Sequence, residues 1–496
     1  MWKMLNKAYP YANNHNPGYK QKNRRKKYMK RKLLCVLLST AMISTMISGC
    51  GSVTTTDESG NAQSSAAVAS SQEAASNQSE ASEATTSAAA TGENADISGD
   101  ITIWDWDGDT AQKYVDEFKK AYPNVNVNIQ DVSWDDYIEK LQTSYVSGMD
   151  IPDIIYGEMA WRGSLYEMDI LDNLEEAPYN LNREDMVDSS VPLCSDPNGN
   201  IVGVEMQVTP AGFAYKRDLA KEYLGTDDPD EVGKMISTWD DFETVGKQVS
   251  EKSGGKVKMM VSLGDVLLST LSQNTVDYVD GDTVDITAKM KEPLAETIKL
   301  RDDGIIGNVE MYSADWYNDY ASEDYIFYEA GSWCPPLVIS QYDPEGSGNW
   351  AVTTPPDGSF NLGGTTLSIY KDSDNKEAAW AYIQYIFFSE KGGSYMYDLT
   401  GNYSCYEPYY SSEYSPMDKE GPVDEFFGGQ SLVDYYINVA APTAKTVAQN
   451  KYDAVVSDVW QQLLPQYMSD NSIDSDKALS MFINAVQEKE PEATIK

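Results

Sequence analysis

Residues 101–129 read ITIWDWDGDTAQKYVDEFKKAYPNVNVNI, which predicts a strand, a helix and a second strand in succession. The opening ITIW is short, apolar and rich in β-branched residues, as a buried strand is. Apolar residues then recur at spacings of three and four along one face of a helix, which Asp109 or Thr110 can cap and Pro123 stops. From Val125 to Ile129 apolar and polar residues alternate, which is the pattern of a half-buried strand.

The same pattern continues beyond this unit. Ser133 and Asp136 form a capping-box-like pair before a predicted helix at 137–147, which Gly148 ends. The sequence DIIY at 153–156 is a third predicted strand. An order of β-α-β-α-β predicts an α/β fold with a parallel sheet and right-handed crossovers.

Later segments are predicted to extend this α/β pattern. We expect a turn at 196–200 before a strand at 201–204, a helix capped by Thr238 and Asp241, strands at 259–263 and 367–370, a helix at 378–388 capped by Asp374 and Glu377, and helices at 452–464 and 477–486.

The N-terminal region predicts export and lipidation. A basic cluster at 30–32 precedes an apolar run at 33–47 and the sequence ISGC at 47–50, which is the arrangement of a secretory signal. The apolar run has 15 residues, fewer than the ~20 that span a bilayer, and a membrane-anchor helix is the alternative. ISGC matches the bacterial lipobox, so we expect residues 1–49 to be removed as a lipoprotein signal peptide. An ordinary signal sequence begins at Met29, and we expect translation to start there. Acyl chains (palmitate) on Cys50 would then hold the protein at the extracytoplasmic face of the cell membrane.

The residues after Cys50 predict a tether. Residues 51–97 contain Ser, Ala or Thr at 28 of 47 positions and no aromatic residue, Pro, Lys or Arg. Such a segment cannot bury enough apolar surface to offset the entropy lost on ordering. We therefore expect residues 50–97 to be a disordered linker, with the folded part starting near Ile97.

Charge and histidine content exclude several classes of function. The chain has 38 Lys and Arg against 78 Asp and Glu, and because residues 1–50 hold 11 basic and no acidic residues, the remainder carries a net charge of −51. Such a surface repels phosphate backbones and anionic lipid, which argues against nucleic-acid partners. The only histidine is His15, so the mature protein has no Ser-His-Asp, Cys-His or HExxH site.

The cysteines carry no metal or redox motif. Cys35 would leave with the signal peptide, and Cys194, Cys334 and Cys405 are widely spaced and without a CxxC. We expect them to be buried free thiols, and one disulfide is the alternative.

Several segments together resemble extracellular solute-binding proteins of family 1, the carbohydrate-binding, maltose-binding-protein-like lipoproteins of ABC importers. They are the lipobox, ITIW at 101–104, IPDIIY at 151–156, NGNIVG at 198–203, YKRD at 215–218, TWDDF at 238–242, AGSW at 330–333, GG at 363–364 and residues 373–388. One departure is Asp169, where the family usually has Gly before Ile170 and Leu171.

The resemblance implies two α/β lobes joined by crossing segments, with a ligand cleft that closes about a hinge. The crossings would lie near 204–207, 353–362 and 402–406, the N-terminal lobe would comprise 98–205 and 361–403, and the C-terminal lobe 206–360 and 404–496.

The first candidate site follows the first predicted strand, because ligands of open α/β sheets bind beyond the carboxyl ends of the strands. An indole fits the apolar face of a sugar ring, and carboxylates accept hydrogen bonds from its hydroxyls. We predict ligand contacts from Trp104, Trp106 and Asp107, and the alternative is that Trp104 packs inside the protein. The Asp-x-Asp-x-Asp spacing invites calcium, but Gly108 and Asp116 do not fit an EF-hand loop, so no metal or cofactor is predicted.

Other candidates lie on later loops and crossings. The remaining predicted ligand contacts are Glu158 and Trp161 after the third strand, Glu205 and Gln207 at the first crossing, Asp265 after the strand at 259–263, Trp333 where the resemblance implies a stacking aromatic, Gly364 for close backbone approach, and Tyr403 at the third crossing. For Glu158 and Trp161 the alternative is a solvated loop with a packed indole.

The leading functional hypothesis is a monomeric binding lipoprotein, not an enzyme. It would capture a sugar or oligosaccharide, close, and deliver it to the membrane permease subunits of an ABC importer. A glycosidase that uses two carboxylates is one alternative, since that chemistry needs no histidine, and Asp105, Asp107 and Glu158 would be its acids. A surface adhesin or sensor of glycans is another.

Overall fold

The computed structural model describes residues 96–149, 151–419, 421 and 424–496. The predicted signal peptide, the lipidation site Cys50 and the tether up to residue 95 lie outside the described residues.

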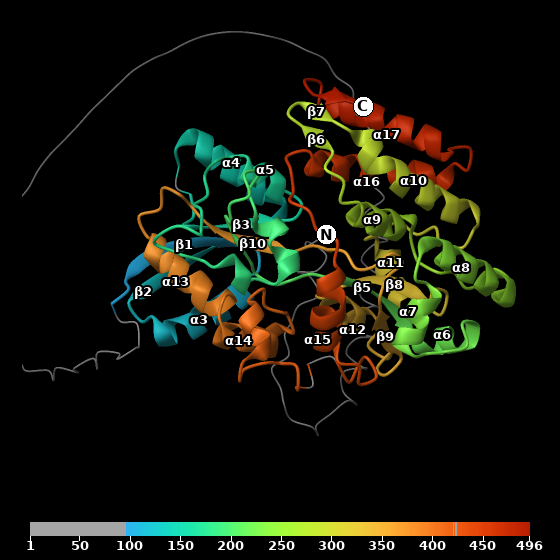
Figure 1. Ribbon diagram of the computed structural model, residues 1–496, viewed down its shortest axis with the longest axis horizontal. Helices are drawn as coiled ribbons and strands as arrows, with labels where there is room; N and C mark the ends of the chain where they lie inside the picture. The colour runs from blue at the N-terminus through green and yellow to red at the C-terminus, as the bar shows by residue number, and fades with distance from the viewer. Residues whose placement is uncertain (1–95, 150, 420, 422–423) are drawn as a thin grey trace, which may run out of the picture. The chain divides into compact units, whose positions relative to one another are not determined.

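A five-stranded sheet with the order β2-β1-β3-β10-β4 is built around the predicted β-α-β-α-β unit (Figure 1). Strand β1 pairs in parallel with β2 and β3, whereas β10 runs antiparallel to β3 and β4. The parallel part confirms the prediction, and β10 makes the sheet mixed. The strands and the helices of this unit are β1 (Gly99–Asp105), α3 (Gly108–Ala121), β2 (Val125–Asp131), α4 (Tyr137–Ser147), β3 (Ile154–Glu158), α5 (Arg162–Tyr166), β4 (Val204–Glu205) and β10 (Thr365–Ile369).

The N-cap of the first helix lies two or three residues earlier than predicted. Asp107, not Asp109 or Thr110, is the N-cap of α3, and its carboxylate accepts a hydrogen bond from the amide of Thr110 at 3.3 Å. Asp109 lies in the first turn, where its charge favours the positive end of the helix dipole. The end of α4 is as predicted, because Gly148 has a φ of 63° and terminates the helix in the left-handed conformation.

Helix α13 (Lys376–Phe387) contacts β1, β10 and α3, and it is followed by α14 (Glu390–Thr400). Its predicted caps, Asp374 and Glu377, are wrong, because the N-cap is Asn375 and Glu377 lies in the first turn. At Asp169, where the family usually has Gly, φ is 51°, and an Asp tolerates this left-handed region better than most residues.

A second sheet has the order β8-β5-β9, with all pairs antiparallel. Thr238 and Asp241 cap α8 as predicted. The strand predicted at 259–263 is wrong, because this segment makes only isolated bridges, including Met260 with Ile306. The elements of this region are β5 (Ala211–Lys216), α6 (Arg217–Tyr223), α7 (Pro229–Met235), α8 (Trp239–Ser253), α9 (Leu263–Gln273), α11 (Ala314–Asn318), β8 (Phe327–Gly331), α12 (Ser340–Tyr342) and β9 (Trp350–Thr353).

The C-terminal segment confirms the two predicted helices. A small three-stranded sheet with the order β11-β7-β6 accompanies them, and α17 packs against α10 and α16. The elements are β6 (Val279–Asp280), β7 (Thr283–Val284), α10 (Ile286–Asp302), α15 (Leu432–Asp434), α16 (Asp453–Ser469), α17 (Ser475–Lys489) and β11 (Thr494–Ile495).

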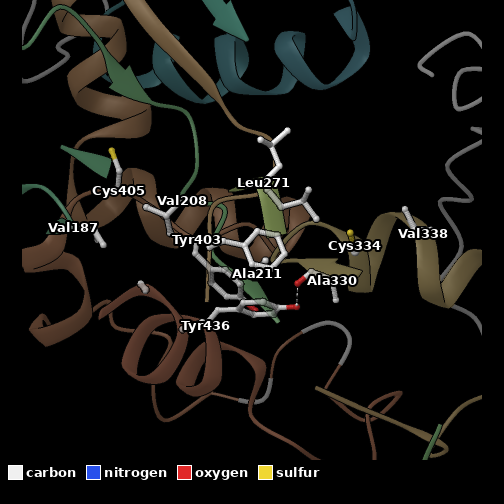
Figure 2. Packing of buried hydrophobic residues seen from close by; sticks show 14 of the residues in the cluster. Val187, Val208, Ala211, Leu271, Ala330, Cys334, Val338, Tyr403, Cys405 and Tyr436 are labelled. Atoms are coloured by element: carbon white, nitrogen blue, oxygen red, sulfur yellow. Dashed lines mark hydrogen bonds between the residues drawn. The ribbon is translucent and has the colours of Figure 1, made fainter. Parts of the chain in front are cut away.

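Residues 208–211, which directly follow the implied crossing near 204–207, lie beside the other two implied crossings. The amide of Val208 donates to the carbonyl of Tyr403 at 2.9 Å, and residues 209–211 exchange backbone hydrogen bonds with residues 360–362. Figure 2 shows Val208 and Ala211 next to the rings of Tyr403 and Tyr436. The exact lobe boundaries at 205, 360 and 403 stay a prediction.

Cysteines and helices complete the comparison with the sequence. Cys194, Cys334 and Cys405 are buried free thiols, which confirms the preferred prediction over a disulfide. Across the described ranges, no helix combines the length and apolarity that crossing a bilayer requires.

Candidate ligand-binding site

Three indoles meet where β1 and β3 end. The two strands are parallel neighbours, with Ile103 opposite Ile154, so the residues that follow them reach the same edge of the sheet. The ring of Trp106 is edge-on to Trp161 at 5.9 Å, and Trp161 lies 5.1 Å from Trp134. We call Trp106, Trp134 and Trp161 the indole cluster. Trp106 and Trp134 are half-buried, whereas Trp161 is buried and donates from its indole nitrogen to the carbonyl of Tyr156.

The structure places Trp104 behind this cluster. It is 3% exposed, and its ring packs edge-on against Tyr137 at 5.9 Å. The ammonium of Lys140 lies over the Trp104 ring, 3.8 Å from its centroid, which is a cation–π distance. The predicted ligand contact of Trp104 stays a prediction, and its observed contacts are with the protein.

The acidic residues of the same loop have internal partners. Asp105 is buried, its Oδ1 accepts from the amide of Asp107 at 2.6 Å, and its Oδ2 accepts from the hydroxyl of Tyr156 at 3.0 Å. Burial raises the pKa of Asp105, and these hydrogen bonds partly offset the increase. Asp107 is half-buried and caps α3, which occupies one of its carboxylate oxygens.

Glu158 ends β3 beside the indole cluster. Its carboxylate accepts from the amide of Ala160 at 2.7 Å, and its carbonyl accepts from the amide of Trp161 at 3.0 Å. The residue as a whole is half-buried, and the loss of water around its carboxyl group raises the pKa of Glu158 to about 7. A carboxyl of this kind can accept or donate a hydrogen bond near neutral pH.

A buried polar junction lies directly behind Glu158. We define it as Arg162, Glu205 and Gly364. The guanidinium of Arg162 donates to the carbonyls of Gly157 at 3.0 Å and Gly364 at 2.8 Å. Its Nη2 lies 3.8 Å from Oε1 of Glu205, which is too long for a hydrogen bond.

Glu205 is therefore incompletely compensated. Its Oε1 is buried and has no hydrogen-bond partner among the described residues. Burial raises its pKa to about 8, and the charge of Arg162 opposes this increase. Gly364 has a φ of 109°, and a Cβ there would lie 2.9 Å from this oxygen. The prediction that Gly364 permits a close backbone approach is therefore consistent with its surroundings, while ligand contact by either residue stays a prediction.

Residues 362–364 connect Trp333 to this junction. The half-buried indole of Trp333 donates to the carbonyl of Leu362 at 2.8 Å, and it lies over Gly363, whose φ is 86°. The carbonyl of Gly364 accepts from the amide of Met159 at 3.0 Å. One short backbone segment thus contacts both Trp333 and the loop that carries Glu158.

The other predicted contacts are Asp265, Tyr403 and Gln207. Asp265 is 1% exposed, completes the capping box of α9 with Ser262, and accepts from the indole nitrogen of Trp316 at 3.0 Å. Burial raises its pKa to about 7. Tyr403 is buried against Tyr436, as Figure 2 shows, and Gln207 is half-buried. Their ligand contacts stay predictions.

Four side chains near the site escaped the sequence analysis. They are Trp134 in the indole cluster, Arg162 in the junction, Asn361, whose amide donates to the carbonyl of Gly363, and Gln449, whose amide donates to the carbonyl of Met159. Trp134 follows the second strand, so the strand-end rule could have found it. Arg162 follows Trp161 directly, but its burial had no sequence signal.

No cluster of three or more His, Cys, Asp or Glu side chains in the described part of the chain is arranged to hold a metal ion.

Comparison with known proteins agrees with this architecture. Residues 113–419 match the family described as bacterial extracellular solute-binding protein. A lactose-binding protein of Rhizobium radiobacter is 24% identical over 389 residues, covering 70% of this chain and 84% of that protein. An arabinooligosaccharide-binding protein of Bacillus subtilis (strain 168) is 26% identical over 327 residues, covering 61% of this chain and 72% of that protein.

Solved structures share the fold. An extracellular solute-binding protein of family 1 superposes with a TM-score of 0.67 at 18% identity, covering 79% of this chain and all of that one. The sugar-binding protein MalE from Xanthomonas citri superposes with a TM-score of 0.64 at 17% identity, covering 79% and 98%. The predicted two-lobed binding-protein fold is confirmed, and the chain belongs to the bacterial extracellular solute-binding protein family.

Proposed function

We propose that this protein binds a sugar or oligosaccharide and delivers it to the permease of an ABC importer. The observation that carries the proposal is a pair of half-buried indoles, Trp106 and Trp333, close to polar backbone and carboxyl groups. The Trp333 indole donates to the carbonyl of Leu362, and the carbonyl of Gly364 accepts from the amide of Met159, which follows Glu158. Aromatic faces bind the apolar faces of sugar rings, and nearby carboxyl and amide groups can bond hydroxyls. The names of the relatives, which bind lactose and arabinooligosaccharides, support the same ligand class.

In this proposal the ligand favours the closed state. A sugar that contacts Trp106 on one lobe and Trp333 on the other has a higher affinity for the conformation in which both surfaces reach it. Binding then shifts the population toward closure without covalent chemistry. Glu158, Asp107 and Gln207 are the proposed hydrogen-bonding partners at the rim, with Trp161, Glu205 and Gly364 behind them.

The anchoring part of the proposal rests on the sequence ISGC at 47–50. Lipid on Cys50 would keep the binding protein near the permease, and two or three acyl chains would do so stably. Replacement of Cys50 by Ala is expected to release the exported protein into the medium and to abolish labelling with palmitate. Retention of the variant in the membrane fraction would contradict a lipid anchor.

A thermal-shift screen tests the ligand class. We would add lactose, arabinotriose, β-1,6-galactobiose and maltose to the mature chain. At 100 times the dissociation constant, the ligand should stabilise the protein by ~2.7 kcal/mol. No shift with any member of a wide glycan panel would contradict the proposal.

Two controls separate the alternatives. Recovery of the sugar unchanged after long incubation distinguishes a binding protein from a glycosidase, because only an enzyme releases shorter products. Retention on insoluble polysaccharide, without binding of soluble oligosaccharides, would favour an adhesin.

A further inference from the structure

We infer that Arg162 is a positioning residue that holds the ligand loop, residues 158–161, in its binding geometry. The loop carries Glu158 and Trp161, two of the proposed ligand contacts. Arg162 itself is fully buried, so it acts through the backbone groups that it binds. The part of this inference that concerns affinity rests on the proposed function.

The guanidinium of Arg162 binds backbone carbonyls on two segments, one just before the ligand loop and one at Gly364. Nε donates to the carbonyl of Gly157, the residue just before the loop, at 3.0 Å. Nη2 donates at 2.8 Å to the carbonyl of Gly364, which also accepts from the amide of Met159 within the loop. Nη1 reaches the carbonyl of Leu193 at 3.5 Å. One rigid, planar group therefore sets the distance between the loop and the crossing segment.

The arrangement requires an arginine rather than any cation. A guanidinium presents several N–H donors in a fixed plane, whereas an ammonium is a compact point charge on a flexible stem. A lysine at this position could bind one of the two carbonyls but not hold both in the same geometry. The Glu158 and Trp161 side chains would then occupy several orientations, and the ligand would have to select one of them.

The buried carboxyl of Glu205 supports a role beyond packing. Arg162 forms an ion pair with it at 3.8 Å but no hydrogen bond, so the hydrogen bonds that orient the guanidinium go to backbone carbonyls. The conformation of Gly364 keeps this carboxyl close to the crossing, since any side chain there would meet Glu205 and Thr209. Residues 362–364 contact both Arg162, through the carbonyl of Gly364, and Trp333, through the carbonyl of Leu362. Arg162 therefore links the loop that carries Trp161 to the backbone that binds Trp333.

The chain offers a matched control in Arg301. Its side chain is 6% exposed and also donates to three backbone carbonyls, those of Tyr467, Asp470 and Ile473. It lies on α10, outside the ligand loop and its contacts. Arg301→Lys therefore removes the same kind of hydrogen bonds with no connection to the loop.

The test compares Arg162→Lys and Arg301→Lys in the mature chain. In the free protein we expect amide hydrogen exchange at residues 158–161 to be at least about tenfold faster in Arg162→Lys, which corresponds to the loss of one charge-assisted hydrogen bond. In Arg301→Lys the exchange of these amides should stay at the wild-type rate. The dissociation constants for lactose and arabinotriose, where the wild type binds them, should rise about tenfold in Arg162→Lys only.

Each outcome decides the inference. Wild-type exchange at 158–161 in Arg162→Lys, or equal effects of the two variants on exchange and affinity, would overturn it. If Arg162→Lys does not fold, Arg162→Gln, which removes the buried charge and the planar guanidinium but keeps a single amide donor group, is compared with Arg301→Gln in the same way. If the wild type binds neither sugar, that result counts against the proposed function, and the exchange rates in the free protein still decide the role of Arg162.

Discussion

The loop after β3 and the first turn of α9 were predicted as ligand contacts by similar reasoning, and the structure treats them differently. Glu158 is half-buried beside two half-buried indoles, and its carboxylate accepts from the neighbouring amide of Ala160. Asp265 is enclosed, caps its own helix and binds the indole of Trp316. A carboxylate after a predicted strand can thus serve either a ligand or the fold, and its internal hydrogen bonds separate the two roles.

The largest expected effect on stability is that of Asp265→Ala. It removes a capping interaction and leaves the buried Trp316 indole and Ser262 amide without their acceptor, so the free energy of unfolding should fall by about 3 kcal/mol. Urea unfolding measures it.

Asp241→Ala is the matched control. Asp241 holds the equivalent position on α8 but is exposed, and its carboxylate accepts from the hydroxyls of Ser237 and Thr238, so its loss should cost about 1 kcal/mol or less. Equal losses in the two variants would contradict a special role for the buried carboxyl. The affinity of folded Asp265→Ala for sugar then tests its predicted ligand contact.

The largest expected effect on affinity is that of Trp333→Ala. An aromatic contact in a desolvated site contributes about 2 kcal/mol, so the dissociation constant for sugar should rise roughly 30-fold, as calorimetric titration would measure. Trp380→Ala is the control, since Trp380 is 8% exposed and packs against Tyr179, and neither is a proposed ligand contact, so it should lower stability without changing affinity. Unfolding of Trp333→Ala with unchanged affinity in the folded fraction would make Trp333 a core residue.

The stability of the protein should depend on pH through its buried carboxyl groups. The pKa of Glu205 is raised from 4.5 to about 8 in the folded protein, and those of Glu158 and Asp265 are raised to about 7. Such groups bind their protons more tightly when folded. Their contribution to stability is present below the unfolded pKa and is lost as pH rises through the folded pKa.

Glu205→Gln should therefore match the wild type near pH 5 and be more stable above pH 8, by a few kcal/mol in order of magnitude. Thermal unfolding between pH 5 and pH 9 measures this difference. A variant less stable than the wild type at high pH would show that Glu205 is stabilised as a carboxylate.

The smallest expected effect is that of Asp107→Ala. Loss of the α3 cap should cost about 1 kcal/mol. Asp109→Ala, which changes a first-turn residue that does not cap, should cost less than half as much by the same measurement of unfolding. A larger loss of stability in Asp109→Ala than in Asp107→Ala would favour Asp109 as the cap, as the sequence predicts.

Strong local patterns explain why much of the fold was predictable. The strands predicted at 101–104 and 153–156 are short segments rich in β-branched and aromatic residues, and the helices near the C-terminus repeat apolar residues at helical spacing. Cap positions were less secure, because Asp107 and Asp109 flank the same glycine and both can accept from the first-turn amides.

The internal contacts of the site depend on residues that are distant in the chain. Arg162 and Gly364 are separated by 202 positions, and Gln449 and Met159 by 290. No local pattern predicts such pairs, and spacing alone does not reveal that Trp104 and Asp265 are buried, while their predicted ligand contacts stay predictions.

The decisive test of sugar binding is calorimetric titration of the mature chain with the oligosaccharide that gives the largest thermal shift. We expect saturable binding at one site per chain, with the sugar recovered intact. Absence of a binding signal for every glycan, or recovery of shortened products, would contradict it.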